Sequence, residues 1–254
     1  MLKYNKDMIT ADDHTTIWRY MDFSSFYALL VNQKLFFKRL DQYTDQLEGQ
    51  LPPETVIDYH SHRLSFPYTT KVEADQWIKK EMANIESFKP SILSNSWNMD
   101  TIENYAMWKI YLRGYNEGVA IQTTVGKLRE QLDANPDFEH VYSGVVSYEP
   151  IPWNNINQYT VATNKRKPYA YEKEYRALIL HEVTVKPNAD GVQERVPNYK
   201  VGAEFKINTE ELIDKIYVSP FAMPWFESAL KVAIKDKLPN FDPNNIIGSA
   251  LIDK

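Results

Sequence analysis

Hydrophobic and polar positions along the chain alternate between helical and strand-like spacing, without a repeat period. Phe23, Phe26 and Leu30 recur at the spacing of one helix face, and Asp22 precedes them as a typical N-cap residue. The same criteria predict further helices over about 72–88, 103–112, 128–132 and 225–238, and strands over 34–40, 92–97, 118–124, 138–148, 172–182, 202–208 and 215–218. This mixture predicts one α+β domain over 1–254, with a mixed, largely antiparallel sheet flanked by helices.

The clearest of these strands, 172–182, begins with charged residues and continues with apolar ones. Period-2 geometry places Glu172, Glu174 and Arg176 on one face, in line with the leucines that follow. The opposite face is apolar from Tyr175 onwards, which indicates a central strand covered on both sides. Because a buried charge must be paired or must line a cleft, the pattern indicates either a structural ion-pair network or a functional pocket.

Two further groups of residues suit a nucleotide. Lys165, Arg166 and Lys167 precede the charged strand and offer a fork and two point charges to a phosphate, although a solvated basic loop has the same composition. Trp108 and Tyr111 share one side of a predicted helix, where they suit stacking on a base or nicotinamide. Such aromatic stripes are more often part of the core.

Composition narrows the class of protein. The chain has 254 residues, 43% of them apolar, with 17 Tyr, 11 Phe and 6 Trp, which is typical of a globular protein with a sizeable core. The absence of cysteine excludes disulfides, thiolate zinc sites and cysteine nucleophiles. A net charge of −5 gives no global attraction to polyanions, so contact with nucleic acid requires a local basic patch. The start of the chain resembles no signal peptide and no apolar run spans a bilayer, so we expect a cytoplasmic protein without membrane contact.

Carboxylates elsewhere in the chain raise a metal-dependent alternative. Asp45 and Glu48 lie in a turn-like stretch and, with Glu172 and Glu174, would form an oxygen-rich site for a divalent cation of a hydrolase or nuclease. Acidic residues are also common in turns without any function. We therefore expect no bound metal.

The chain resembles a bacterial and phage family known as domain of unknown function 2971. The resemblance covers about residues 17 to 251 and rests on the order of several short pieces. These are Trp18-Arg19-Tyr20, Lys34-Leu-Phe-Phe with Asp45, Glu48 and Gly49, Trp97 with Ala106-Met-Trp-Lys-Ile-Tyr111, Glu117-Gly-Val-Ala-Ile121, and Lys165-Arg166 with Tyr169, Glu172, Glu174 and Arg176. The family name carries no activity, and membership implies a setting in phage defence or a toxin system.

A second resemblance concerns motif order. The chain is similar to ADP-ribosyltransferases that use an Arg, Ser-x-Ser, Glu-x-Glu series, through Arg19, then Ser94 and Ser96, then Glu172 and Glu174. It departs from that pattern in having Ser-Asn-Ser and in lacking a recognisable motif around the arginine.

This second resemblance implies NAD as the cofactor. Breaking the nicotinamide glycosidic bond passes through an oxocarbenium-like state, which a fixed carboxylate stabilises. In that assignment Glu174 steadies the ribose, Glu172 orients the acceptor, and Arg19 and Arg166 grip the dinucleotide.

Three functions stay open at this stage. The leading one is a nucleotide- or nucleic-acid-directed enzyme, most concretely an NAD-dependent ADP-ribosyltransferase with nucleic acid as an acceptor. The others are the metal-dependent hydrolase and a non-catalytic sensor that binds a nucleotide or peptide. Asp45 and Glu48 next to Glu174 would favour the hydrolase, whereas Arg19 and the serine pair facing Glu174 would favour the transferase.

Overall fold

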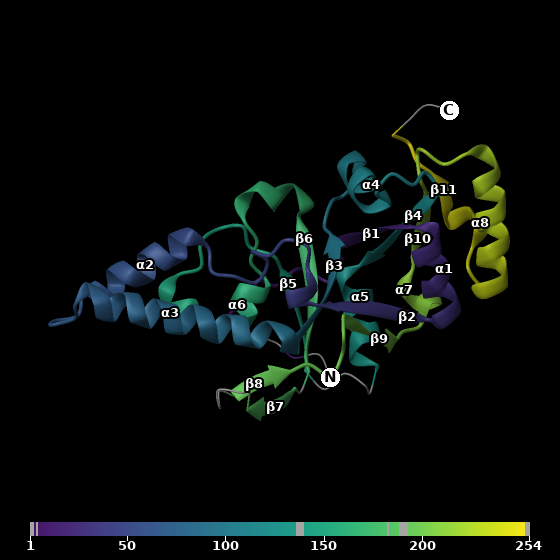
Figure 1. Ribbon diagram of the computed structural model, residues 1–254. Coiled ribbons are helices and arrows are strands. Elements are labelled where there is room, and N and C mark those ends of the chain that lie inside the picture. Colours follow the sequence, from purple (N-terminus) through teal and green to yellow (C-terminus); the bar gives the residue numbers. More distant parts are fainter. Residues whose placement is uncertain (1–2, 4, 136–139, 182, 188–192, 252–254) are drawn as a thin grey trace.

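A computed structural model describes residues 3, 5–135, 140–181, 183–187 and 193–251 (Figure 1). Its main sheet contains β1 (Thr16–Asp22), β2 (Lys34–Arg39), β3 (Ile92–Asn98), β4 (Gly118–Thr124), β5 (Val141–Val145), β6 (Glu174–Leu180), β9 (Gly202–Lys206), β10 (Lys215–Val218) and β11 (Ile246–Gly248). Only β10 and β11 pair in parallel among these strands, and β7 (Thr184–Pro187) and β8 (Gln193–Val196) form a separate antiparallel hairpin. The predicted α+β class with a mixed, largely antiparallel sheet is confirmed.

Helices cover both faces of this sheet. They are α1 (Phe23–Asn32), α2 (Pro53–Leu64), α3 (Lys71–Phe88), α4 (Tyr105–Leu112), α5 (Val125–Asp133), α6 (Gln158–Ala162), α7 (Thr209–Leu212) and α8 (Pro224–Lys237), with short 3-10 turns at η1 (Leu40–Gln42) and η4 (Lys167–Glu172) among others. The side chain of Asp22 accepts a hydrogen bond from the Ser25 amide and caps α1, as predicted. No helix within the described ranges is both long and apolar enough to cross a bilayer.

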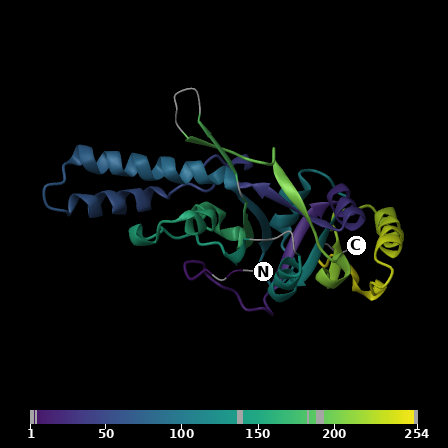
Figure 2. The same cartoon turned by 90° about the horizontal axis from the view of Figure 1, so that it is seen from below.

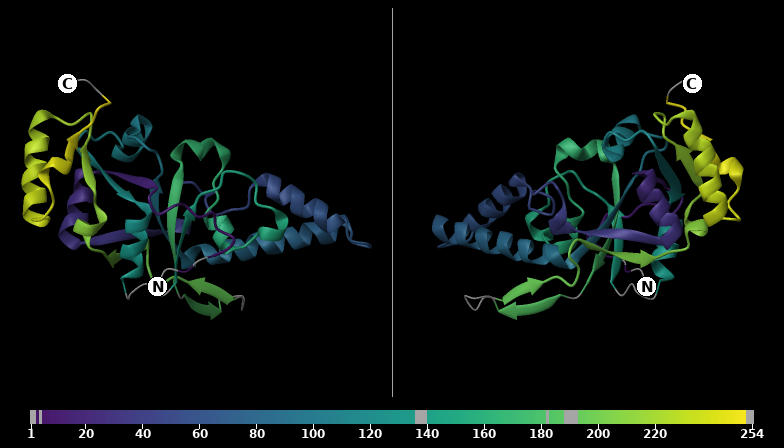
Figure 3. Two further views of the ribbon diagram at one scale, coloured as in Figure 1. Left: turned by 180° about the vertical axis from the view of Figure 1, so that it is seen from behind. Right: turned by 45° about the vertical axis from the view of Figure 1, so that its right-hand side comes forward.

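The two faces of the sheet carry different layers. Apolar side chains of α1, α5, α7 and α8 form the larger core on one face, together with Trp97 of β3 and Tyr175 of β6. The other face holds smaller clusters beneath α4 and beneath α6. Figures 1 and 2 show α2 and α3 side by side, extending together away from the sheet, and Figure 3 shows α8 at the opposite end. This arrangement leaves part of the second face between α4 and α6.

The sheet splits along one edge of β3. Strand β6 pairs with all of β3 from Ile92 to Asn98, so β1 and β2 must share the other edge. Strand β2 pairs there with Leu93 and Ser94, whereas β1 pairs only with Asn98. In the described part of the chain, no strand therefore pairs along that edge with the β3 segment between these two junctions, which is centred on Ser96. The gap lies in the middle of the sheet, where side chains must satisfy the backbone.

Several predicted boundaries differ from the structure, and one long helix was missed. The charged strand begins at Glu174 because Glu172 ends η4, and Lys173 between them adopts a left-handed conformation with φ of 41°. Its predicted end at 182 lies outside the described residues. Helix α2 begins at Pro53, a position in the first turn where proline needs no amide hydrogen, and no helix was predicted there. The predicted strand at 138–148 is shorter, over Val141–Val145, with 138–139 outside the described residues.

Replacing Gly202 with alanine should weaken the pairing of β9 with β2. A Cβ atom there would collide with the carbonyl oxygen of Phe37 and lie 2.7 Å from the Phe36 ring, so the strands must move apart. We expect a loss of about 2 kcal/mol in the free energy of unfolding, measured with urea. Gly248→Ala is the control, because a Cβ atom at that position would meet nothing within 4 Å. Equal stability of the two variants would contradict this packing.

Candidate functional site

Glu174 and Arg176 form a buried ion pair on the second face of the sheet. The Arg176 guanidinium donates through Nε to Oε1 of Glu174 at 2.7 Å and through Nη2 to Oε2 at 2.9 Å. Its Nη1 donates to Oε1 of Glu48 at 2.8 Å and to the Ala162 carbonyl at 2.6 Å. The Arg176 side chain is 0% exposed and both glutamates are 3% exposed, so water does not screen these charges. The period-2 prediction of two inward charges is confirmed.

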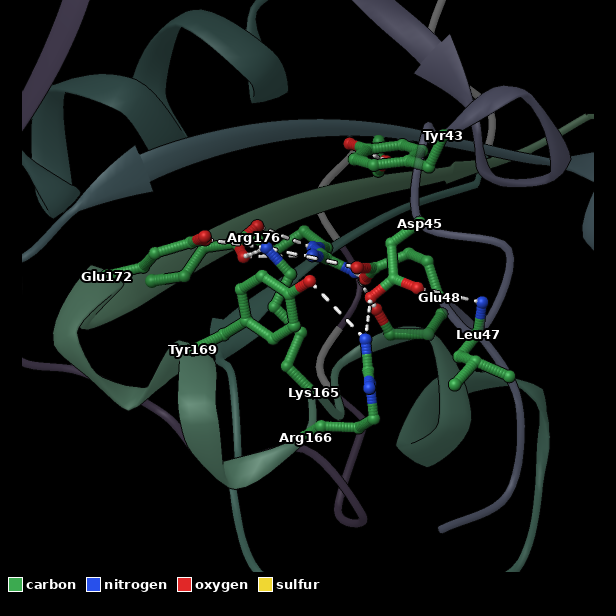
Figure 4. A network of polar contacts seen from close by, with 12 residues as sticks. Tyr43, Asp45, Leu47, Glu48, Lys165, Arg166, Tyr169, Glu172 and Arg176 are labelled. Atoms are coloured by element: carbon green, nitrogen blue, oxygen red, sulfur yellow. Dashed lines mark hydrogen bonds and ion pairs between the residues drawn. The ribbon is translucent and has the colours of Figure 1, made fainter. Parts of the chain in front are cut away.

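Lys165 brings a third carboxylate to the pair. Its ammonium lies 2.6 Å from Oε2 of Glu172, 2.9 Å from Oε2 of Glu174 and 3.9 Å from Oε2 of Glu48. Burial alone lowers the pKa of Lys165, but the carboxylates outweigh it and hold that pKa well above its ordinary value. In Figure 4 Glu172 lies at one end of the group and Glu48 at the other, with Arg176 between them. We call Glu48, Lys165, Glu172, Glu174 and Arg176 the charged cluster.

The pKa values of Glu174 and Glu172 are shifted in opposite directions. Burial alone raises the pKa of Glu174, but Arg176 and Lys165 outweigh it and hold that pKa at about 2. Burial also raises the pKa of Glu172, and Lys165 reverses only part of the shift. At neutral pH Glu174 is therefore a permanent anion, while Glu172 is the carboxylate that binds a proton more readily.

Glu48 lies next to Glu174, as the metal-dependent alternative required, yet cations already occupy the space between them. Arg176 bridges the two carboxylates, and Lys165 borders both. Asp45 instead forms an ion pair with Arg166 at 2.8 Å, at the surface. Within the described part of the chain, no three His, Cys, Asp or Glu side chains are grouped as metal ligands would be. No observation on these residues favours a metal site.

Arg19 of β1 fills the split in the sheet. Its Nη1 donates to the Ser96 carbonyl at 2.9 Å, on the edge of β3 that has no strand partner, and its guanidinium lies 5.8 Å from the Trp97 ring. Burial lowers the pKa of Arg19, and the nearby Tyr111 and Tyr43 oppose this. No carboxylate pairs with Arg19 among the described residues, so this partly buried cation has no counter-ion there.

Two tyrosines connect Arg19 with the charged cluster. Burial raises the pKa of Tyr111, and Glu174 and Glu172 raise it further, while 40% of the Tyr111 surface stays exposed. Tyr43 donates to or accepts from Ser94 Oγ at 2.8 Å. Arg19, the two tyrosines and the carboxylates thus border one region between α4 and η4.

The predicted site residues separate into two groups. Glu172, Glu174, Arg176 and Lys165 belong to the charged cluster, together with Glu48. Ser96 and Tyr111 lie beside it, whereas Arg19 and Ser94 are joined to it only through Tyr111 and Tyr43. Ser96 helps to lower the pKa of Glu174, yet its buried Oγ makes no hydrogen bond of ordinary geometry. Trp108 lies apart, because it is 0% exposed against Tyr20 and its indole donates to Glu103, which leaves no ring face for a ligand. Arg166 is exposed and paired with Asp45.

Sequence reasoning missed Tyr43 and Tyr148. Tyr43 follows η1 in a turn, where no periodicity marks it, and its ring lies 5.7 Å from the Arg176 guanidinium. The Tyr148 hydroxyl accepts a hydrogen bond from the Glu174 amide at 3.0 Å, and burial raises its pKa to about 12. Both contacts join residues far apart in sequence, so only the high tyrosine content hinted at them.

Comparisons with known proteins give little further identification. No protein-family model matches the chain, and no curated protein is significantly similar to it. A solved structure that does match is that of DarT from Thermus sp. 2.9 in complex with ADP-ribosylated ssDNA, with 10% identity over 95% of this chain and 97% of that chain. Because the TM-score is 0.40, this likeness carries no argument about the present chain.

Glu174→Gln should destabilise the fold strongly. The change leaves Lys165 and Arg176 buried with one negative charge fewer, and breaking such a pair costs about 3 kcal/mol. Glu149→Gln is the control, because the Glu149 and Lys167 side chains are 70% and 78% exposed and an exposed pair contributes little. Urea unfolding at pH 7 measures both. A Glu174→Gln variant as stable as Glu149→Gln would contradict a buried ion pair.

Acid should remove the same stabilisation. The pKa of Glu174 is about 2 in the folded chain and near 4.5 in the unfolded chain, so the unfolded state binds its proton first as pH falls. The contribution, on the order of 3 kcal/mol, is complete above about pH 5 and is lost between about pH 4.5 and 2. The stability difference between wild type and Glu174→Gln should shrink over that range. A difference that stays constant down to pH 3 would rule out the lowered pKa.

Proposed function

We propose that the chain binds NAD at the split in the sheet and transfers its ADP-ribose group to an acceptor. The observation that carries this proposal is Arg19, a partly buried guanidinium without a carboxylate partner among the described residues, next to Tyr111, which in turn lies near Glu174 and Glu172. A cation in this state gains more from an anionic ligand than a paired one does. The pyrophosphate of a dinucleotide supplies such an anion.

The surroundings of Arg19 suit the rest of the dinucleotide. Arg19 is partly exposed, and its Nε and Nη2 make no hydrogen bond to the described residues. Tyr43 and Tyr111 both lie near Arg19, and the ring of Tyr111, which is 40% exposed, offers a stacking surface for nicotinamide or adenine.

The chemistry follows from the charges. When the bond between the ribose C1′ and nicotinamide breaks, the electron pair leaves with nicotinamide and positive charge develops on the ribosyl group. A carboxylate of the charged cluster stabilises that charge, and the acceptor then bonds to C1′ and releases its proton. An acceptor reaching this point passes η4, where Tyr171 is 46% exposed beside Glu172. We propose nucleic acid as the acceptor class, because exposed aromatic rings stack on its bases.

A second candidate function is a non-catalytic nucleotide sensor. The observation in its favour is that Arg176 and Lys165 occupy both carboxylate oxygens of Glu174. Such a protein would bind NAD through Arg19 and the tyrosines but release no nicotinamide. The metal-dependent hydrolase has no comparable support.

Wild-type protein incubated with NAD and a single-stranded oligonucleotide should release nicotinamide and label the oligonucleotide. Arg19→Ala should weaken NAD binding about tenfold or more, because it removes the cation that faces the phosphates. Calorimetry measures binding, and chromatography measures nicotinamide. Lys80→Ala is the charge-matched control, since Lys80 lies exposed on α3, away from the sheet.

Three outcomes separate the candidates. Nicotinamide release by wild type, with weakened binding by Arg19→Ala alone, supports the transferase. Binding that depends on Arg19 without any release identifies the sensor. Absence of NAD binding, or equal binding by all three proteins, contradicts the proposed site.

A further inference from the structure

From the contacts of the two glutamates we infer that Glu172 is the carboxylate that faces the substrate, and that Glu174 is a positioning residue that never touches it. This inference rests on the proposed function and deepens it. It reverses the assignment implied by motif order, in which Glu174 steadies the ribose. The grounds are the number of contacts that each carboxylate already makes and the access that each one has.

Both carboxylate oxygens of Glu174 already have a cationic partner. Its Oε1 accepts from Arg176, and its Oε2 accepts from Arg176 and lies 2.9 Å from the Lys165 ammonium. Its backbone amide is bound to the Tyr148 hydroxyl, and its side chain is 3% exposed. Oε1 keeps one lone pair, but at 3% side-chain exposure a ribose hydroxyl could reach it only by moving the side chains that bury it.

Glu172 has one oxygen free. Its Oε2 lies 2.6 Å from Lys165, whereas Oε1 has no hydrogen-bond partner among the described residues and is not among the fully buried atoms without one. The side chain is 13% exposed, four times as much as that of Glu174. Both glutamates raise the pKa of Tyr111, so this partly exposed tyrosine lies near them. A substrate atom can therefore reach Oε1 of Glu172 without breaking an ion pair.

The backbone between the two glutamates sets this difference. Lys173 has φ of 41° and ψ of 56°, a conformation that costs a non-glycine residue roughly 1 kcal/mol and persists only where the surroundings impose it. Its ammonium pairs with Asp100 at 2.6 Å, and its carbonyl accepts from the Met99 amide. This turn takes Glu172 out of the strand while Lys165 still joins both carboxylates. Glu174 thus acts on Glu172 through Lys165.

The reaction assigned to Glu172 balances as follows. The C1′–N bond of NAD breaks and nicotinamide leaves with the electron pair. The Glu172 carboxylate stabilises the positive charge that develops on the ribosyl group. A water molecule or an acceptor hydroxyl then forms the new C1′–O bond, and its proton passes to Oε1 of Glu172. Because burial raises the pKa of Glu172, this carboxylate accepts a proton more readily than an ordinary glutamate.

The test is NAD hydrolysis, with water as the acceptor, by wild type, Glu172→Gln and Glu174→Gln. We expect Glu172→Gln to lower kcat about 100-fold or more with little change in KM, because it removes the carboxylate that faces the substrate. Glu174→Gln should keep activity within about tenfold of wild type at a temperature where it is folded. Circular dichroism melts establish that temperature, and Glu174→Asp serves if Glu174→Gln does not fold.

The pH profile distinguishes a catalytic role from a structural one. In wild type and in the Glu174 variants, kcat should rise with pH through a midpoint above the ordinary glutamate pKa of about 4.3, because Glu172 must lose its proton to act. Glu172→Gln should lack that rise.

Two results would overturn the inference. A folded Glu174 variant without hydrolysis, beside an active Glu172→Gln, restores the motif-order assignment and leaves the proposed function intact. Wild type that binds NAD and cleaves none with water or with an oligonucleotide removes both the inference and the transferase.

Discussion

The structure of the site depends on the buried pair of Glu174 and Arg176. Two opposite charges in the interior of a sheet are tolerated only when every donor and acceptor is satisfied, and here one guanidinium reaches Glu174, Glu48 and the Ala162 carbonyl. Those contacts attach the segment after η1 and the end of α6 to strand β6. Lys165 extends the pair to Glu172 at the edge of the cluster. The ion pair thereby fixes the surface beside it without facing that surface.

The split in the sheet supplies what the charged cluster lacks, a cation that is free to bind. Within the cluster, the two cations and three carboxylates satisfy one another almost completely. Arg19 lies on strand β1 and donates one hydrogen bond to the Ser96 carbonyl, where no neighbouring strand of the described residues supplies an amide. An arginine used in this way keeps the rest of its planar fork for a ligand. The cluster therefore keeps one net negative charge, and Arg19 supplies a positive charge, unpaired within the described part of the chain, elsewhere in the split.

Much of the fold and part of the site followed from the sequence. Period-2 alternation correctly placed Glu174 and Arg176 inside, because that inference needs only local geometry. The same rule extended the strand to Glu172 in error, since the left-handed turn at Lys173 depends on Asp100 and Met99, about 73 residues away along the chain. The contact of Glu48 with Arg176 has the same non-local origin. Trp108 and Tyr111 were predicted on one side of a helix, but Trp108 is buried in the core and Tyr111 is 40% exposed. The way α4 lies on the sheet sets this difference.

Nitrogen NMR of the arginine side chains tests directly whether Arg19 binds the anionic part of a dinucleotide. Protein labelled with 15N-arginine is titrated with NAD, and the Nε–H resonance of Arg19 is assigned by its loss in Arg19→Lys. If Arg19 binds the dinucleotide, its resonance shifts and saturates with NAD, while the resonance of Arg176, which is held by Glu174, stays in place. Saturable binding of NAD that leaves the Arg19 resonance unmoved would contradict it.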